Sequence, residues 1–247
     1  MQVNFLTGGT QKGGTGAVHK FLSEHPQICL AKQKEVHFFD NDAFFRTHRE
    51  PINYRPYHEY FTGRATTKVF GEATPIYMYW EPSAERIKAY NPSMRLIFIL
   101  RDPIERAYSQ YNMQRRRGIE LLSFSTAIRL ESVRCRQAFS LQRRRYSYVD
   151  RGFYSRQIKN MMRFFPREQM LFLKTEDLKH RHTETIDRIC DFLGVARLHH
   201  DRPAIVSSHR YPSMSLSDKT FLKRKFEEEI LELEALLGWD CASWMST

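Results

Sequence analysis

The sequence predicts an α/β fold in which a central, mainly parallel sheet is flanked by helices. Three observations support this prediction: short apolar runs recur along the chain, stretches of helical periodicity separate them, and glycine or proline marks many junctions. Strands that alternate with helices form βαβ units, whose strands run parallel in one sheet. Because ligands of such folds bind beyond the carboxyl ends of the strands, functional residues are expected directly after the predicted strands.

The N-terminal quarter of the chain predicts two strands and one helix. The apolar run VNFL (3–6) leads into two glycines, as a buried strand does before a tight turn. A helical pattern starts at Thr15, and QICLA (27–31) predicts a second strand. KEVHFF (34–39) predicts a short element that ends in aromatic residues. The Tyr-, His-, Arg- and Pro-rich residues 40–66 predict irregular or partly helical structure.

The middle of the chain repeats the alternation of strand and helix. KVFGEATP (68–75) predicts a strand closed by a turn, and PSAERIKAYN (82–91) predicts a helix. MRLIFILRDP (94–103) contains the strongest strand pattern of the chain, and a helix is predicted to begin within residues 104–118.

The C-terminal half predicts four helical regions and one strand. Residues 119–150 are helical in pattern and very basic, and residues 154–166 predict a further helix. QMLFLKTEDL (169–178) predicts a strand. Helices are expected over 184–195 and 216–237, and each has a glycine at its end, where glycine is the commonest helix terminator.

Length and composition indicate one globular domain. The 247 residues include 41% hydrophobic and 13% aromatic residues, which argues against disorder. No linker or internal repeat is evident, so we expect a single domain over 1–247 with a basic, insertion-like region at about 115–150. The net charge of +11 favours an anionic partner: nucleic acid, acidic lipid, acidic polymer or a phosphate-rich cofactor.

Location and metal content are predicted from what the sequence lacks. No apolar run is long enough for a membrane helix, and MQVNFLTGG lacks the features of a signal peptide, so a cytoplasmic protein is expected. The four cysteines form no CxxC spacing, so neither a disulfide framework nor a metal site is expected. Cys29 and Cys190 lie in apolar contexts and are predicted to be buried thiols.

A glycine-rich loop joins the first strand to the first helix. In TGGTQKGGTGAVHKFLSEHP (7–26), backbone N–H groups, a helix N-terminus and Lys12 are placed to hold a phosphate-like anion. The loop departs from the Walker A pattern, because Lys12 precedes Thr15 by three positions instead of one. An ordinary tight turn between strand and helix is the alternative.

A second candidate anion site follows the strongest strand. Arg101 lies just past its carboxyl end, and Ser109 lies about two turns into the next helix. A guanidinium and a hydroxyl so placed suit a second phosphate. In the alternative, Arg101 forms a surface ion pair with Asp102 and Ser109 is an ordinary residue of the helix face.

These motifs together resemble the sulfotransferase superfamily, whose members use 3′-phosphoadenosine 5′-phosphosulfate (PAPS). The resemblance is to the heparan-sulfate-type branch and its bacterial relatives, and it covers nearly the whole chain. GTQKGGTGAVHKFLSEHP resembles the 5′-phosphosulfate loop, RLIFILRDPIERAYSQY the 3′-phosphate motif, and KEVHFFD the glutamate-containing segment of the glucosaminyl O-sulfotransferases. The resemblance implies a P-loop-like three-layer domain that moves a sulfuryl group to a hydroxyl or amine, with PAPS as co-substrate and no metal.

The resemblance also implies roles for individual residues. The 5′-phosphosulfate would be held by Lys12 and the loop N–H groups, and the 3′-phosphate by Arg101 and Ser109. The N–H groups are those of Gly13, Gly14, Thr15 and Gly16. Tyr154 and Arg210 fall in segments that close over the nucleotide in relatives.

The acid–base residues implied by the resemblance lie in KEVHFFD. Glu35 would be the general base, and His37 a second base or a partner of Glu35. The alternative role of Glu35 is a salt bridge to one of three nearby lysines: Lys12, Lys32 or Lys34.

The chain departs from the family pattern at one position. The heparan sulfate enzymes have a lysine in a Glu-Lys-Thr-Pro stretch, and this chain has Ala73 there. Either Lys12 suffices, or Lys32 or Lys34 supplies the missing positive charge.

The acceptor is left open by the sequence: a carbohydrate, a lipid or a natural product, possibly anionic, is expected. The basic residues from 115–117 to 143–145 either line an acceptor cleft or form a solvated helical face, and the aromatic residues of 40–66 either shape an acceptor pocket or pack on the sheet. Two other classes compete with a sulfotransferase: a P-loop kinase that uses ATP and magnesium, and a basic nucleic-acid-binding protein.

Overall fold

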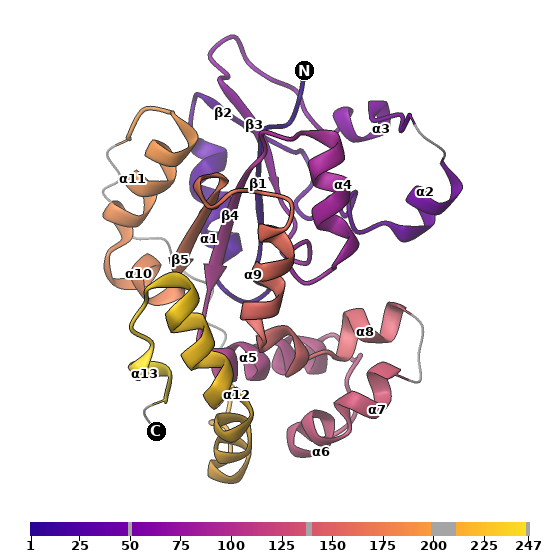
Figure 1. Cartoon of the computed structure of the whole chain (residues 1–247), viewed down its shortest axis with the longest axis vertical. Helices are drawn as coiled ribbons and strands as arrows, with labels where there is room; N and C mark the ends of the chain where they lie inside the picture. The colour runs from indigo at the N-terminus through magenta and orange to yellow at the C-terminus, as the bar shows by residue number, and fades with distance from the viewer. Residues whose placement is uncertain (49–50, 137–139, 199–210, 246–247) are drawn as a thin grey trace. The chain divides into compact units, whose positions relative to one another are not determined.

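The computed structural model describes residues 1–48, 51–136, 140–198 and 211–245. The chain forms two compact units (Figure 1), which are described separately: Met1–Leu100 with Lys159–Ser208, and Arg101–Ile158 with His209–Thr247. The single domain expected over 1–247 stays a prediction. Within the described ranges, no helix has the length and apolarity that crossing a membrane requires.

The first unit is built on one parallel sheet, as the sequence predicts. Its described residues form five strands in the order β2-β3-β1-β4-β5, and every neighbouring pair is parallel. In β4, every residue except the first is buried, which explains its near-continuous apolar sequence. The strands are β1 (Phe5–Gly9), β2 (Ile28–Leu30), β3 (Val69–Ala73), β4 (Arg95–Leu100) and β5 (Met170–Lys174).

Helices cover both faces of this sheet. Figure 1 shows α11 and α4 on opposite sides of it. Apolar residues of α1, α10 and α11 form one core cluster with the sheet, including Val18, Leu178 and Ile189. The helices of this unit are α1 (Thr15–Glu24), α2 (Asp42–Thr47), α3 (Arg55–His58), α4 (Pro82–Tyr90), α10 (Thr175–His180) and α11 (His182–Leu193), with a short 3-10 helix η2 (Arg167–Gln169) before β5.

One predicted element of this unit is wrong. Residues 34–39 form neither a helix nor a strand. The backbone of this segment cannot continue a regular element, because Glu35 and His37 have positive φ angles of 61° and 57°.

The aromatic residues that precede and follow α2 pack on one another. Tyr57 of α3 is fully buried and stacks on Phe38 with ring centroids 4.7 Å apart. Phe61 is also buried, whereas Phe44 and Phe45 are partly exposed. Tyr57 and Phe61 therefore fit the packing interpretation of residues 40–66. Among the buried cysteines are Cys29 and Cys190, both free thiols as predicted.

The second unit is helical. Its longest described helices are α5 and α12, which pack on each other. Asp102 caps α5 by accepting a hydrogen bond from the N–H of Ile104 at 2.8 Å, and Gly238 ends α12 in the left-handed conformation. The elements are α5 (Pro103–Arg116), α6 (Phe124–Arg129), α7 (Glu131–Arg136), α8 (Ser140–Tyr146), the 3-10 helix η1 (Asp150–Gly152), α9 (Tyr154–Met162, which continues into the first unit), α12 (Leu216–Leu237) and α13 (Ala242–Met245).

The basic region of the second unit contains structural as well as exposed arginines. Arg134 of α7 pairs with the buried carboxylate of Glu120 at 2.8 Å, and the hydroxyl of Tyr148 donates to the same carboxylate at 2.8 Å. Arg116 and Arg117 at the end of α5 are exposed. The solvated-face interpretation therefore fits only part of this region.

The pairing of β1 with β3 depends on a glycine, and this can be tested. Gly71 pairs with Phe5, and a Cβ atom at position 71 would lie 2.3 Å from the Phe5 ring. We expect Gly71→Ala to lower the free energy of unfolding by about 1–3 kcal/mol, measured by urea denaturation. In Phe5→Leu/Gly71→Ala the clash is relieved, so the combined loss should be smaller than the sum of the two single losses. Additive losses would contradict the contact.

Candidate functional site

The glycine-rich loop is held against β4 and α10. A Cβ atom at position 13 would lie 2.2 Å from the carbonyl oxygen of Ile99, so only glycine fits there. The N–H of Gly13 donates to the carbonyl of Thr10 at 2.9 Å, and the hydroxyl of Thr175 donates to the carbonyl of Gly13 at 2.5 Å. The loop is thus fixed before any ligand binds.

Three backbone donors remain at the start of α1. The N–H groups of Gly14, Thr15 and Gly16 make no hydrogen bond within the described part of the chain, and they lie at the positive end of the helix dipole. Three such donors at the N-terminus of a ten-residue helix suit an anion. The N–H of Gly13 was also predicted to contact the anion, but in the structure it donates to the carbonyl of Thr10 within the turn.

Lys34 brings a second lysine to this loop. A Cβ atom at position 16 would lie 3.4 Å from Lys34 Nζ, so the ammonium group lies beside Gly16. Lys34 Nζ is also 3.7 Å from Glu35 Oε1. The ammonium of Lys32 instead donates to the carbonyl of Glu59 at 3.4 Å. Of the two lysines considered as replacements for the family lysine, Lys34 is thus the one placed at the loop.

Glu35, His37 and Asp40 form a chain of charged groups. His37 Nε2 lies 3.7 Å from Glu35 Oε2, and His37 Nδ1 lies 3.0 Å from Asp40 Oδ2. The hydrogen bond to Asp40, and next the one to Glu35, raise the pKa of His37 to about 9. His37 therefore carries a positive charge at neutral pH. Asp40 is only 1% exposed, and the imidazolium of His37 compensates its negative charge.

A buried carboxylate under this chain fixes its backbone. Glu72, at the end of β3, accepts hydrogen bonds from the hydroxyls of Tyr57 at 3.1 Å, Tyr77 at 2.7 Å and Thr74 at 2.5 Å. The hydroxyl of Tyr77 in turn accepts the N–H of Phe38 at 3.1 Å. Burial raises the pKa of Glu72, while the three hydroxyls act in the opposite direction. The segment that carries Glu35 and His37 is therefore tied to the sheet.

Backbone strain marks the same residues. Among the described residues, the non-glycine positions with positive φ are Lys12 at 72°, Glu35 at 61° and His37 at 57°. Such conformations cost about 1–3 kcal/mol each and cluster at functional sites. All three are residues that the sequence had singled out.

Two further residues of this site were not identified from the sequence. Asp40 ends the KEVHFFD motif, and its spacing of three from His37 was the available signal. His19 of α1 has a buried Nδ1 that finds no hydrogen-bond partner among the residues the structure describes. Burial, and next the charge of Lys34, lower the pKa of His19, so its imidazole is neutral at pH 7. No pattern in the sequence indicated His19.

The second predicted anion site lies in the second unit. Arg101 directly follows β4, and its Nη2 lies 3.2 Å from Glu105 Oε2. The buried hydroxyl of Tyr154 donates to the Arg101 carbonyl at 2.9 Å. Ser109 is a buried residue of α5. Arg210 lies outside the described residues.

Comparisons with curated proteins agree with these motifs. Heparan sulfate glucosamine 3-O-sulfotransferase 3B1 of Mus musculus is 30% identical over 194 residues, which cover 78% of this chain and 46% of the relative. Bifunctional heparan sulfate N-deacetylase/N-sulfotransferase 2 of Homo sapiens is 26% identical over 272 residues, which cover 98% of this chain and 30% of the relative. The chain spans less than half the length of these two relatives.

A solved structure and a family model also match this chain. A sulfotransferase from Alicyclobacillus acidocaldarius superposes with a TM-score of 0.84 at 26% identity, over 100% of both chains. The family described as the sulfotransferase domain matches residues 3–224, which include the glycine loop, the KEVHFFD segment and the Arg101 motif. The chain therefore belongs to the sulfotransferase family.

Proposed function

We propose that this chain transfers a sulfuryl group from PAPS to a hydroxyl or amine of an acceptor. The observation that carries the proposal is one cluster in the first unit. At the start of α1, three N–H groups have no partner in the described part of the chain. Lys34 lies beside Gly16, and Glu35 lies 3.7 Å from the ammonium of Lys34. An anion-binding loop next to a carboxylate supplies both requirements of the reaction. Family membership supports this function over a P-loop kinase or a nucleic-acid-binding protein.

In the proposed reaction, the bond between sulfur and the bridging phosphate oxygen breaks while the acceptor oxygen or nitrogen bonds to sulfur. Negative charge develops on the bridging oxygen, and Lys12, Lys34 and the loop N–H groups neutralise it. Glu35 takes the proton that the acceptor loses. The products are the sulfated acceptor and 3′-phosphoadenosine 5′-phosphate (PAP).

The proposed role of His37 is that of a partner of Glu35 and not of a second base. A base must have a free lone pair, and an imidazole with a pKa of about 9 is protonated at neutral pH. As an imidazolium between two carboxylates, His37 holds Glu35 in its charged, proton-accepting form. Asp40 orients the ring through Nδ1.

We further propose that Arg101 and Ser109 bind the 3′-phosphate of the nucleotide. The guanidinium offers a planar fork of donors, and Ser109 of α5 offers a hydroxyl. Tyr154 fixes the backbone of Arg101 through its hydroxyl. Tyr154 is thus a positioning residue, and no direct nucleotide contact is assigned to it.

The acceptor is proposed only as a class. The relatives are named as sulfotransferases of heparan sulfate, which is an anionic carbohydrate. A carbohydrate, lipid or natural product with a free hydroxyl or amine is the acceptor we propose for this chain. The departure at Ala73 is balanced by Lys34.

The proposed nucleotide specificity predicts that PAP binds more tightly than AMP, ADP or ATP with magnesium, measured by calorimetry. Arg101→Ala should weaken PAP binding about tenfold or more, because a charge-assisted contact to the 3′-phosphate is lost, and should leave ADP binding unchanged. Arg117→Ala removes an exposed arginine of the same unit and should change neither PAP binding nor ADP binding. Tighter binding of ATP with magnesium, indifferent to Arg101, would contradict the proposal.

The role of Lys34 predicts a loss of turnover in Lys34→Met. We expect kcat with PAPS to fall about 100-fold, because one cation at the developing charge is lost, while the KM for PAPS changes less. Lys32→Met is the matched control, since the ammonium of Lys32 is bound to a carbonyl elsewhere. Equal effects of the two substitutions would refute this role.

The two histidines near the loop are predicted to have pKa values on opposite sides of 6.5. Proton NMR of their ring resonances measures these values. His37 should titrate near 9, and His19 below 6.5. Because folding raises the pKa of His37, its stabilising contribution is complete below about 6.5 and is lost as the pH rises through about 9.

Asp40→Asn tests the cause of this shift. It should move the His37 titration to lower pH and leave His19 in place, because Asp40 makes the largest contribution to the raised pKa. A wild-type His37 that titrates near 6.5 would contradict the imidazolium assignment.

A further inference from the structure

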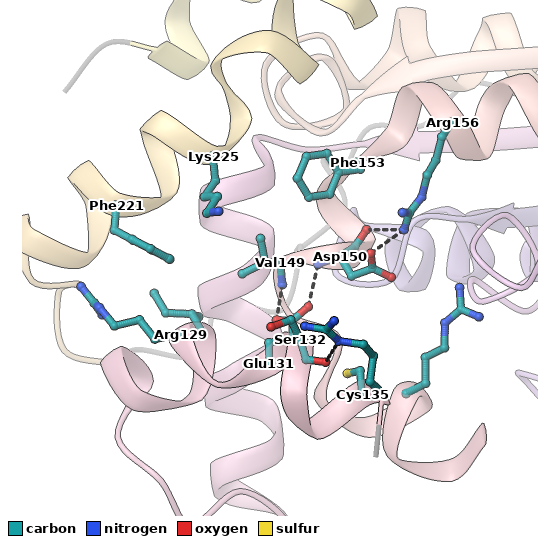
Figure 2. Close-up of a pocket in the computed structure, with 13 residues that line it drawn as sticks. Arg129, Glu131, Ser132, Cys135, Val149, Asp150, Phe153, Arg156, Phe221 and Lys225 are labelled. Atoms are coloured by element: carbon teal, nitrogen blue, oxygen red, sulfur yellow. Dashed lines mark hydrogen bonds and ion pairs between the residues drawn. The ribbon is translucent and has the colours of Figure 1, made fainter. Parts of the chain in front are cut away.

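A cavity in the second unit lies among α6, α7, η1 and α12 (Figure 2). Its volume is about 700 Å³, within the range of small-molecule sites, and all of its lining residues belong to this unit. None of the residues assigned above to the loop, the base or the 3′-phosphate lines it. The proposed sulfuryl transfer therefore does not account for this cavity.

The lining of the cavity is strongly cationic. Arg129, Arg136, Arg143, Arg156 and Lys225 line it, against two acidic residues. A cavity lined by an excess of cations favours an anionic ligand.

The two acidic groups of the lining are already engaged. The carboxylate of Glu131 accepts the N–H groups of Val149 and Asp150 at 2.6 and 2.7 Å, as the dashed lines in Figure 2 show. Asp150 pairs with Arg156 at 2.6 Å. Burial raises the pKa of Glu131 to about 7, which further reduces the negative charge it contributes. These contacts engage both acidic groups of the lining.

Arg136 and Lys225 have no carboxylate partner within the described ranges. Arg136 donates through Nε to the carbonyl of Ser132 at 3.1 Å, which leaves its two terminal nitrogens for a ligand. Lys225 Nζ lies 5.9 Å from the ring of Phe221. By contrast, Arg129 is paired with Asp218 at 2.7 Å.

The remaining lining is apolar. Phe153 and Phe221 present rings, and Arg129 lies over the Phe221 ring at 4.7 Å from its centroid. Ile128 and Val149 add aliphatic surface, and burial raises the pKa of the Cys135 thiol to about 11, so the thiol stays neutral. A ligand of this cavity therefore has an apolar body as well as an anionic group.

The geometry points to a binding site for an amphipathic organic anion: its sulfate, phosphate or carboxylate group pairs with Arg136 and Lys225, and its apolar body packs between Phe153 and Phe221. This site is independent of the proposed transfer reaction, since no group of the reaction lines it. An apolar cavity with a few convergent charged groups is the usual form of a small-molecule site.

The test uses 2-naphthyl sulfate as the probe and calorimetry on the full chain. We expect binding at one site, and each of Arg136→Gln and Lys225→Gln should weaken it about tenfold, the effect of one charge-assisted contact. Both side chains are exposed, so the variants should fold. Arg224→Gln is the matched control, because Arg224 is an exposed neighbour on α12 that does not line the cavity.

Two comparisons locate the probe and identify what is recognised. Neutral 2-naphthol should bind at least tenfold more weakly, and equal binding would overturn recognition of the anion. Saturating PAP and the variant Lys12→Ala should leave 2-naphthyl sulfate binding unchanged. Loss of probe binding in either case would place the probe in the transfer site and overturn the proposal, whereas PAP binding itself reports separately on the proposed function.

Discussion

The site in the first unit depends on one buried carboxylate. Glu72 is fully buried at the end of β3, and an ionised group in such a position is tolerated only when its oxygens are hydrogen-bonded. Its donors come from α3, from the turn after β3 and from the KEVHFF segment. Each of these pieces is held by its bond to the same two oxygens. A segment without regular structure is thereby anchored to the sheet.

This anchoring makes the strained backbone of the site possible. Glu35 and His37 keep left-handed conformations that a free loop would abandon, because the N–H of Glu35 donates to the Ala73 carbonyl at 3.1 Å and Tyr77 holds Phe38. Glu35 lies near both His37 and Lys34, at 3.7 Å from each. Charges that meet in this way are ordered before any ligand binds, which the proposed sulfuryl transfer requires.

The second unit uses its positive charge for three different purposes. Arg134 neutralises the buried Glu120, Arg116 and Arg117 face solvent, and Arg136 and Lys225 line a cavity. Neither interpretation of the basic region made from the sequence is complete on its own, because a run of arginines does not reveal which of them meets a carboxylate. That information depends on residues distant in the chain, such as Asp218 for Arg129.

The sequence by itself determined the α/β class, the five strands, the glycine loop and the family, since each depends on local periodicity or on residues adjacent in the chain. The apolar run at β4, the glycine before α1 and the KEVHFFD motif are examples. Only the tertiary structure decided that Lys34 and not Lys32 lies at the loop, that the N–H of Gly13 is occupied, and that Asp40 and His19 belong to the site. It also revealed the cavity beside α12. The physical reason is that the charge state and partners of a side chain are set by groups brought close in space, and a linear pattern contains no distances.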